Sequence, residues 1–210
     1  MTESPVGLPP AETALLESTA RSMATAGATL GGNQRRHLAV LSRSLVDGGD
    51  GASTAPPSSN RPLEELTHRL ATAPATIRPS WIQELEQTGI PSSTYVEVLG
   101  LVSRLIAVDT FAFALGTEPV PLPEAADDWP TGELDDEAVL DGGWVPTVGR
   151  ASPPTALSLV PAELRAMLEL HEVFYLSIPD MGDLDADRGL HRTQMELVAA
   201  RTSLLNECFF

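Results

Sequence analysis

Apolar residues recur at intervals of three and four along most of the chain, a spacing typical of helices that pack through one face. The first run covers residues 11–46 and is interrupted at Gly31 and Gly32. The same spacing resumes at Leu63 and continues to about Gly116, and it returns from residue 155 to the last residues, with breaks at prolines and glycines. Alternation of apolar and polar positions, which is typical of strands, does not occur between the turn signals. The sequence therefore predicts an all-α fold, a helical bundle.

The most regular helix is expected over residues 94–115. Thr94 and Glu97 have the spacing of a capping box, in which each side chain bonds the other residue's backbone. Ser92 or Ser93 could equally cap this end. Apolar residues occupy nearly every face of the helix, which places it at the centre of a bundle or in an oligomer interface. One short bundle should not cover so much apolar surface, so we expect a homo-oligomer that forms through this helix.

Two polar stretches separate the helical runs. Residues 47–62 are rich in Gly, Ser, Pro and Asp and are expected to form a mobile loop. Residues 117–154 are expected to form an acidic, proline-rich connector, because residues 118–141 hold nine acidic residues and no basic one. Their spacing lacks the EF-hand pattern, so a solvated connector is preferred to a calcium site. The predicted organisation is a flexible tail over residues 1–10, a first helical unit over residues 11–116, the connector, and a second unit over residues 155–210.

Charge and composition restrict the partners. The formal net charge is −16, the 13 basic residues are all arginine, and no basic stripe is present, so neither nucleic acid nor an anionic membrane is an expected partner. The N-terminus has no basic segment followed by an apolar one, as a signal peptide would. The single cysteine excludes an intramolecular disulfide framework and fits a reducing compartment. These features predict a cytoplasmic protein.

Four further residues have structural interpretations. Pro161 suits the first turn of a helix, and Glu163 is placed to interact favourably with the dipole of that helix. His171 lies in an apolar stripe and is expected to be a core histidine with its hydrogen bonds satisfied. His37 follows two arginines and is expected to be solvated.

The last helix, expected from about His191 to the end, carries the most specific pattern in the chain. Glu196 precedes Cys208 by twelve positions, in the stretch ELVAARTSLLNEC. This stretch resembles the alkylhydroperoxidase D-like, or carboxymuconolactone decarboxylase-like, family. The signature of that family is a glutamate, a Cys-x-x-Cys twelve residues later, then three residues and a histidine. The segments IPSSTYVEVLGLVSRLIAVDTFAFALG and PVPLPEA are also similar to the closing helix and tail of such a unit.

The resemblance covers residues 63–125 and 155–210. It implies a bundle of the alkylhydroperoxidase D-like type with two family-like units, the first of which has no cysteine. In the second unit, the position of the second cysteine would directly follow Phe210, and the histidine would lie four residues beyond that. The second unit is therefore expected to be truncated before its Cys-x-x-Cys is complete.

The resemblance implies a thiol-dependent peroxidase, an antioxidant oxidoreductase that needs neither a cofactor nor a metal. In family members the second cysteine attacks the peroxide O–O bond, and the first resolves the sulfenic acid as a disulfide. The glutamate and the histidine relay protons. Carried over residue by residue, Cys208 is the resolving thiol and Glu196 is a proton relay. The implied partners are a hydroperoxide substrate and a thiol reductant.

Several observations favour a structural interpretation instead. Thr193 and Glu196 also match a capping box. A straight helix would place Glu196 about 18 Å from Cys208, so the catalytic interpretation requires the helix to break, for which Asn206 is suitable. Cys208 alone could be a small buried hydrophobe. The chain would then be a non-catalytic helical protein that oligomerises. The decarboxylase branch of the same superfamily, which does not use the thiol pair, is a third interpretation.

Overall fold

The computed structural model describes residues 7–46 and 61–205, and within these ranges the chain is helical with no strand. The predicted all-α class is thereby confirmed. The described ranges contain seven α-helices: α1 (Pro10–Ser22), α2 (Gly32–Val46), α3 (Arg61–Thr72), α4 (Pro79–Gln87), α5 (Ser92–Ala114), α6 (Pro161–Phe174) and α7 (Arg192–Leu205). Three short 3₁₀ helices cover Pro74–Thr76, Pro153–Thr155 and Pro179–Gly182. Most of the predicted loop 47–62 lies outside the described residues.

The chain divides into two compact units, an N-terminal unit (Met1–Leu170) and a C-terminal unit (His171–Phe210). The division falls within α6, so most of that helix belongs to the N-terminal unit. The connector over residues 117–154 also belongs to the N-terminal unit. The organisation into two family-like units stays a prediction.

Proline and glycine set the boundaries of the central helices. Pro79 occupies the first turn of α4, where its missing N–H costs no hydrogen bond. Just beyond the end of α4, Gly89 has a φ of 90°, a left-handed conformation that glycine adopts without strain. Pro91 then precedes α5, and no side chain caps this end. The expected capping box of Thr94 and Glu97 is therefore wrong, because Glu97 is used elsewhere in the fold.

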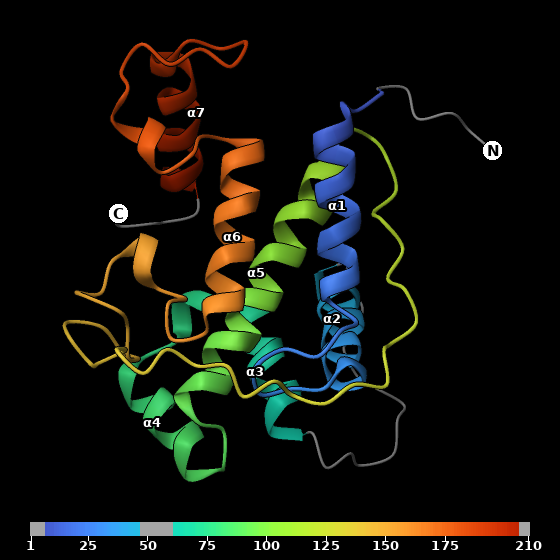
Figure 1. The fold of residues 1–210 in the computed structure, drawn as a ribbon, viewed down its shortest axis with the longest axis vertical. Coiled ribbons are helices and arrows are strands. Elements are labelled where there is room, and N and C mark those ends of the chain that lie inside the picture. Colours follow the sequence, from blue (N-terminus) through green and yellow to red (C-terminus); the bar gives the residue numbers. More distant parts are fainter. Residues whose placement is uncertain (1–6, 47–60, 206–210) are drawn as a thin grey trace. The chain divides into compact units, whose positions relative to one another are not determined.

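Helix α5 is the centre of the N-terminal unit and contacts α1, α2, α3 and α4 (Figure 1). This explains its apolar composition on nearly every face, since four helices cover it. Of the alternatives for this helix, a position at the centre of the bundle is confirmed, and self-association stays a prediction. Phe113, near the end of α5, is 83% exposed.

The acidic connector is tied to the turn between α1 and α2. The carboxylate of Asp128 accepts hydrogen bonds from the backbone N–H of Ala26 (2.8 Å) and of Gly32 (3.1 Å), the first residue of α2. Backbone bonds join Ala126 to Ala24 and Thr131 to Gly27. Asp128 thus caps α2 from a distant part of the chain. Its negative charge also interacts favourably with the dipole of α2, which has no acidic residue in its own first turn.

The C-terminal unit contains the end of α6, the 3₁₀ helix Pro179–Gly182 and α7. Helix α7 buries Arg192, whereas four of its apolar side chains are exposed: Leu197, Val198, Leu204 and Leu205. Among the described residues, no helix combines the length and the apolar content needed to cross a membrane.

Candidate functional site

Glu196, the candidate proton relay, lies in the second turn of α7 with its side chain 49% exposed. Its carboxylate accepts a hydrogen bond from the hydroxyl of Tyr175. The same carboxylate forms an ion pair with the buried guanidinium of Arg192, 2.8 Å from Nε to Oε1. The pair is spaced i, i+4 on the helix, and this spacing could have identified Arg192 from the sequence. No local pattern pointed to Tyr175.

These partners set the protonation states. The hydrogen bond from Tyr175 lowers the pKa of Glu196, and the charge of Arg192 lowers it further, so the carboxylate is ionised at neutral pH. Partial removal from water raises the pKa of Tyr175, and its bond to Glu196 acts in the same direction. The phenol therefore remains a donor. The cluster presents an ionised carboxylate close to solvent, the state that a proton acceptor requires.

The alternative role of Glu196 as a helix cap is wrong. Helix α7 begins at Arg192, so Glu196 lies too far into the helix to cap it. The side chain of Gln194 instead accepts a hydrogen bond from the backbone N–H of His191, at 3.0 Å. This bond is one half of a capping box formed by His191 and Gln194, two positions before the predicted box of Thr193 and Glu196.

Cys208, the candidate resolving thiol, lies outside the described residues, as does Asn206. Its position relative to Glu196 stays a prediction. His171 is half-buried, with Nδ1 2.5 Å from the carbonyl oxygen of Leu176 and its ring edge-on to Tyr175. His171 thus has the satisfied hydrogen bond expected of a core histidine. His37 differs from its prediction, because its Nε2 lies 2.9 Å from Glu64 rather than being bonded only to water.

A second cluster of charged side chains is buried in the N-terminal unit and was not predicted. Arg35 of α2, Glu97 and Arg104 of α5, and Glu163 of α6 form one connected network. Arg35 donates from Nη1 to Glu97 (2.6 Å) and to Glu163 (2.9 Å), and Arg104 donates from Nη2 to Glu163 (2.6 Å). Each of these side chains is at most 3% exposed. The network joins three helices and has no net charge.

Uncharged groups complete the hydrogen bonding. The second oxygen of Glu97 accepts from the backbone N–H (2.6 Å) and the hydroxyl (2.7 Å) of Thr29. Arg35 and Arg104 donate to the carbonyl and the hydroxyl of Ser22, respectively. Buried charges need such partners, because an unpaired ion in the interior costs several kcal/mol. Glu163 lies in the first turn of α6, as expected for a favourable interaction with the helix dipole, and its carboxylate also pairs with two arginines.

The network favours the charged forms of Glu163 and Arg35. Burial raises the pKa of Glu163, but the attraction of Arg104 and Arg35 outweighs this, and the net effect is a lowered pKa. Burial lowers the pKa of Arg35, and the attraction of Glu163 and Glu97 again prevails, so this pKa is raised. Because all four side chains are enclosed, a substrate cannot reach them. We therefore assign the network to stability and not to chemistry.

The lowered pKa of Glu163 predicts acid sensitivity. A carboxyl whose pKa is lower in the folded than in the unfolded state stabilises the fold above its unfolded pKa, about 4.5, and that contribution is lost as the pH falls further. We expect the free energy of unfolding to decrease below about pH 4.5. Urea titrations from pH 7 to about pH 2 measure this slope, which should be smaller in Glu163→Gln than in Glu169→Gln, an exposed position on α6. Equal slopes would contradict the assignment.

Comparison with family models, with curated proteins and with solved structures gives no match. Within the described part of the chain, no three His, Cys, Asp or Glu side chains converge in a way that could hold a metal ion.

Proposed function

We propose that this chain contributes to an alkylhydroperoxidase-like thiol oxidoreductase, with Glu196 as the proton relay and Cys208 as the resolving thiol. The observation that carries the proposal is the spacing of these two residues, twelve positions apart as in the family signature. The ionised state of Glu196 adds support, because a relay must begin as a proton acceptor. We also propose that the helical bundle is of the alkylhydroperoxidase D-like type.

The proposed cycle has two thiol steps. A peroxidatic thiolate attacks the O–O bond of a hydroperoxide, which gives a sulfenic acid and releases an alcohol. The resolving thiol of Cys208 then attacks the sulfenic sulfur, a disulfide forms and water leaves. A thiol reductant finally returns the disulfide to two thiols. Glu196 accepts the proton of the attacking thiol and returns one to the leaving alkoxide.

The cycle requires two thiols, and the 210 residues contain one. We therefore expect no significant peroxide turnover from these residues alone. Turnover should appear in a chain extended by a cysteine directly after Phe210 and a histidine four residues beyond it. Consumption of an alkyl hydroperoxide in the presence of a dithiol measures the activity. An inactive extended chain would contradict the proposal, and turnover by the 210 residues that is lost in Cys208→Ser would make Cys208 the attacking thiol.

The relay role has its own test in the extended chain. Glu196→Gln should lower kcat about a hundredfold, the lower end of the range for general acid–base catalysis. Glu172→Gln, an exposed glutamate of the same unit, is the matched control and should be neutral. Tyr175→Phe should shift the acidic limb of the pH–rate profile to higher pH, because it removes the hydrogen bond that lowers the pKa of Glu196. A stability loss without a rate loss in Glu196→Gln would favour the non-catalytic interpretation.

A further inference from the structure

Two of the three tryptophans of the chain lie in the connector over residues 117–154, and both are exposed. Trp129 is 87% exposed and Trp144 is 52% exposed. The third, Trp81 of α4, is half-buried and has the guanidinium of Arg69 stacked on its ring, 4.2 Å from the ring centroid. Within the described ranges, no cation stacks on Trp129. Most of a large aromatic ring therefore lies in water at this position, although its burial would be strongly favourable.

The backbone on both sides of Trp129 is fixed to the turn between α1 and α2. Before Trp129, the N–H of Ala126 and the carboxylate of Asp128 are bonded to that turn. After it, Thr131 and Gly132 donate their backbone N–H groups to carbonyl oxygens of the same turn, at 2.8 and 2.9 Å. Because these bonds lie within three positions of Trp129 on either side, the connector cannot turn the indole ring inward. The exposure of the ring is therefore a property of the fold.

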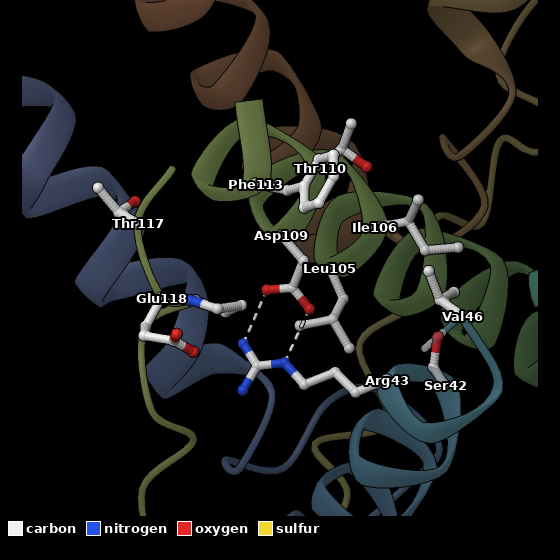
Figure 2. A pocket seen from close by; sticks show the side chains of 11 residues that line it. Ser42, Arg43, Val46, Leu105, Ile106, Asp109, Thr110, Phe113, Thr117 and Glu118 are labelled. Carbon is white, nitrogen blue, oxygen red and sulfur yellow. Dashed lines mark hydrogen bonds and ion pairs between the residues drawn. The ribbon is translucent and has the colours of Figure 1, made fainter. Parts of the chain in front are cut away.

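Two arginines of α2 hold the part of the connector that comes before this segment (Figure 1). Arg36 donates from Nε to the carbonyl oxygen of Pro123 at 2.7 Å, and Arg43 donates from Nη2 to that of Val120 at 2.9 Å. Figure 2 shows that Arg43 is itself held in place, because it bonds both oxygens of Asp109, at 2.7 and 2.8 Å. The connector is therefore fixed at several points before it reaches the exposed tryptophan.

The sequence around Trp129 is acidic. Residues 124–137 contain no basic residue and seven acidic ones: Glu124, Asp127, Asp128, Glu133, Asp135, Asp136 and Glu137. Glu124 and Glu133 pair with arginines at 3.6 and 3.5 Å. Three of the others, Asp127, Asp136 and Glu137, are exposed and form no ion pair with another described residue. These charges attract a cationic partner and repel an anionic one.

An exposed indole ring between carboxylates has the chemistry that recognises arginine. A guanidinium stacks on the face of a tryptophan and pairs with carboxylates through several N–H donors. The stack of Arg69 on Trp81 is an example within this chain. Tryptophan and arginine are also enriched among the side chains that dominate binding at interfaces. A second copy is a poor occupant, because two chains with a net charge of −16 repel each other.

We propose that Trp129 anchors an arginine-containing peptide segment of another protein. One arginine of that segment stacks on the indole ring, and neighbouring basic side chains pair with Asp127 and with the carboxylates of residues 133–137. The fixed connector holds the indole ring in place before binding, so little conformational entropy is lost when the segment binds. Neither Glu196 nor Cys208 takes part, so the interaction is independent of the proposed thiol chemistry.

Binding of fluorescein-labelled octa-arginine, followed by fluorescence anisotropy in about 0.15 M NaCl, tests the role of Trp129. Trp129→Ala should weaken the affinity at least about tenfold, because the stacked cation loses its ring. Trp144→Ala is the matched control, since it removes another exposed tryptophan of the connector without changing the net charge, and it should leave the affinity unchanged. Charge attraction alone would affect the two variants alike, so equal affinities would overturn the proposal.

A second pair of comparisons separates recognition of arginine from general attraction of charge. Octa-lysine carries the same charge as octa-arginine and should bind at least about threefold more weakly, because an ammonium group lacks the planar fork of donors. Asp127→Asn should weaken octa-arginine binding more than Glu84→Gln does, although each removes one negative charge from an exposed position. Equal affinities for the two peptides, or equal effects of the two substitutions, would overturn the proposal.

The melting temperature of Trp129→Ala should equal that of the unchanged protein, because an 87% exposed side chain makes few packing contacts. If it falls, the indole N–H signals of the unchanged protein decide the location. Octa-arginine should shift the signal of Trp129 and not that of Trp81, and an unmoved Trp129 signal overturns the proposal. Sedimentation of the chain alone tests a second copy as the occupant, since a dimer that is lost in Trp129→Ala would also overturn it.

Discussion

Replacing Glu163 with glutamine is expected to lower the free energy of unfolding by about 3–5 kcal/mol, the usual cost of breaking a buried ion pair from one side. Glutamine keeps the shape of the side chain but not its charge. Among the described residues, Glu163 is the only carboxylate paired with Arg104, so Arg104 would lose its partner, and Arg35 would retain Glu97 alone. The side-chain amide of glutamine would also place an N–H group against the N–H groups of the arginines, and two donors cannot form a hydrogen bond with each other. The loss is thus mainly the cost of uncompensated buried charge.

Urea unfolding at pH 7, followed by circular dichroism, measures this effect. Glu169→Gln is the matched control, because it makes the same chemical change on an exposed face of α6, and it should cost less than about 0.5 kcal/mol. A loss of similar size in both variants would show that the network contributes little. A double replacement of Glu163 and Arg104 by apolar residues should recover part of the loss, since it removes both charges together.

Gly100→Ala is expected to destabilise the fold by about 1–3 kcal/mol, although alanine favours helices more than glycine does. Gly100 lies inside α5, where the carboxylate of Glu163 passes close to the helix. A Cβ at this position would lie 2.5 Å from Oε2 and 2.9 Å from Cβ of Glu163. The carboxylate cannot move aside cheaply, because two arginines hold it. The clash therefore outweighs the gain in helix propensity.

Whether Gly100→Ala raises or lowers the free energy of unfolding tests the close approach of α5 and α6. Ala107→Gly, at an exposed position of the same helix, calibrates the intrinsic preference and should cost about 0.5–1 kcal/mol. If the clash did not matter, Gly100→Ala would stabilise the protein by a similar amount. A higher urea midpoint for Gly100→Ala than for the unchanged protein would therefore refute the close approach of α5 and α6.

Local rules predicted the helices well, because their boundaries depend on neighbours in sequence. The prolines at 79, 91 and 161 and the glycine at 89 lie where helices begin or end. The apolar composition of α5 correctly indicated a central helix. These signals need no knowledge of distant contacts.

The same rules misplaced the charged residues, because their partners are distant. Thr94 and Glu97 match a capping box, but Glu97 pairs with Arg35, 62 positions away. Asp128 caps α2 from 96 positions away, where composition had suggested a solvated connector. A capping motif and a buried ion pair use the same residue types, and only the packing of helices distinguishes them.

The residues around Glu196 could be predicted only in part. The position of Glu196 on the last helix agrees with the expectation, and Arg192 has the spacing of a helical ion pair. Tyr175 could not be predicted, since it lies 21 positions earlier and reaches Glu196 only through the folding of its unit.

The length of chain between Arg35 and Glu163 has a consequence for synthesis on the ribosome. The two residues are 128 positions apart, so at about 5–20 residues per second Glu163 emerges on the order of ten seconds after Arg35. Until then, the nascent helices α1 to α5 would enclose two arginines against one carboxylate. Burial of that excess charge is unfavourable, so the core around Arg104 should remain hydrated while translation continues. The N-terminal unit should therefore complete its packing only after α6 has left the exit tunnel.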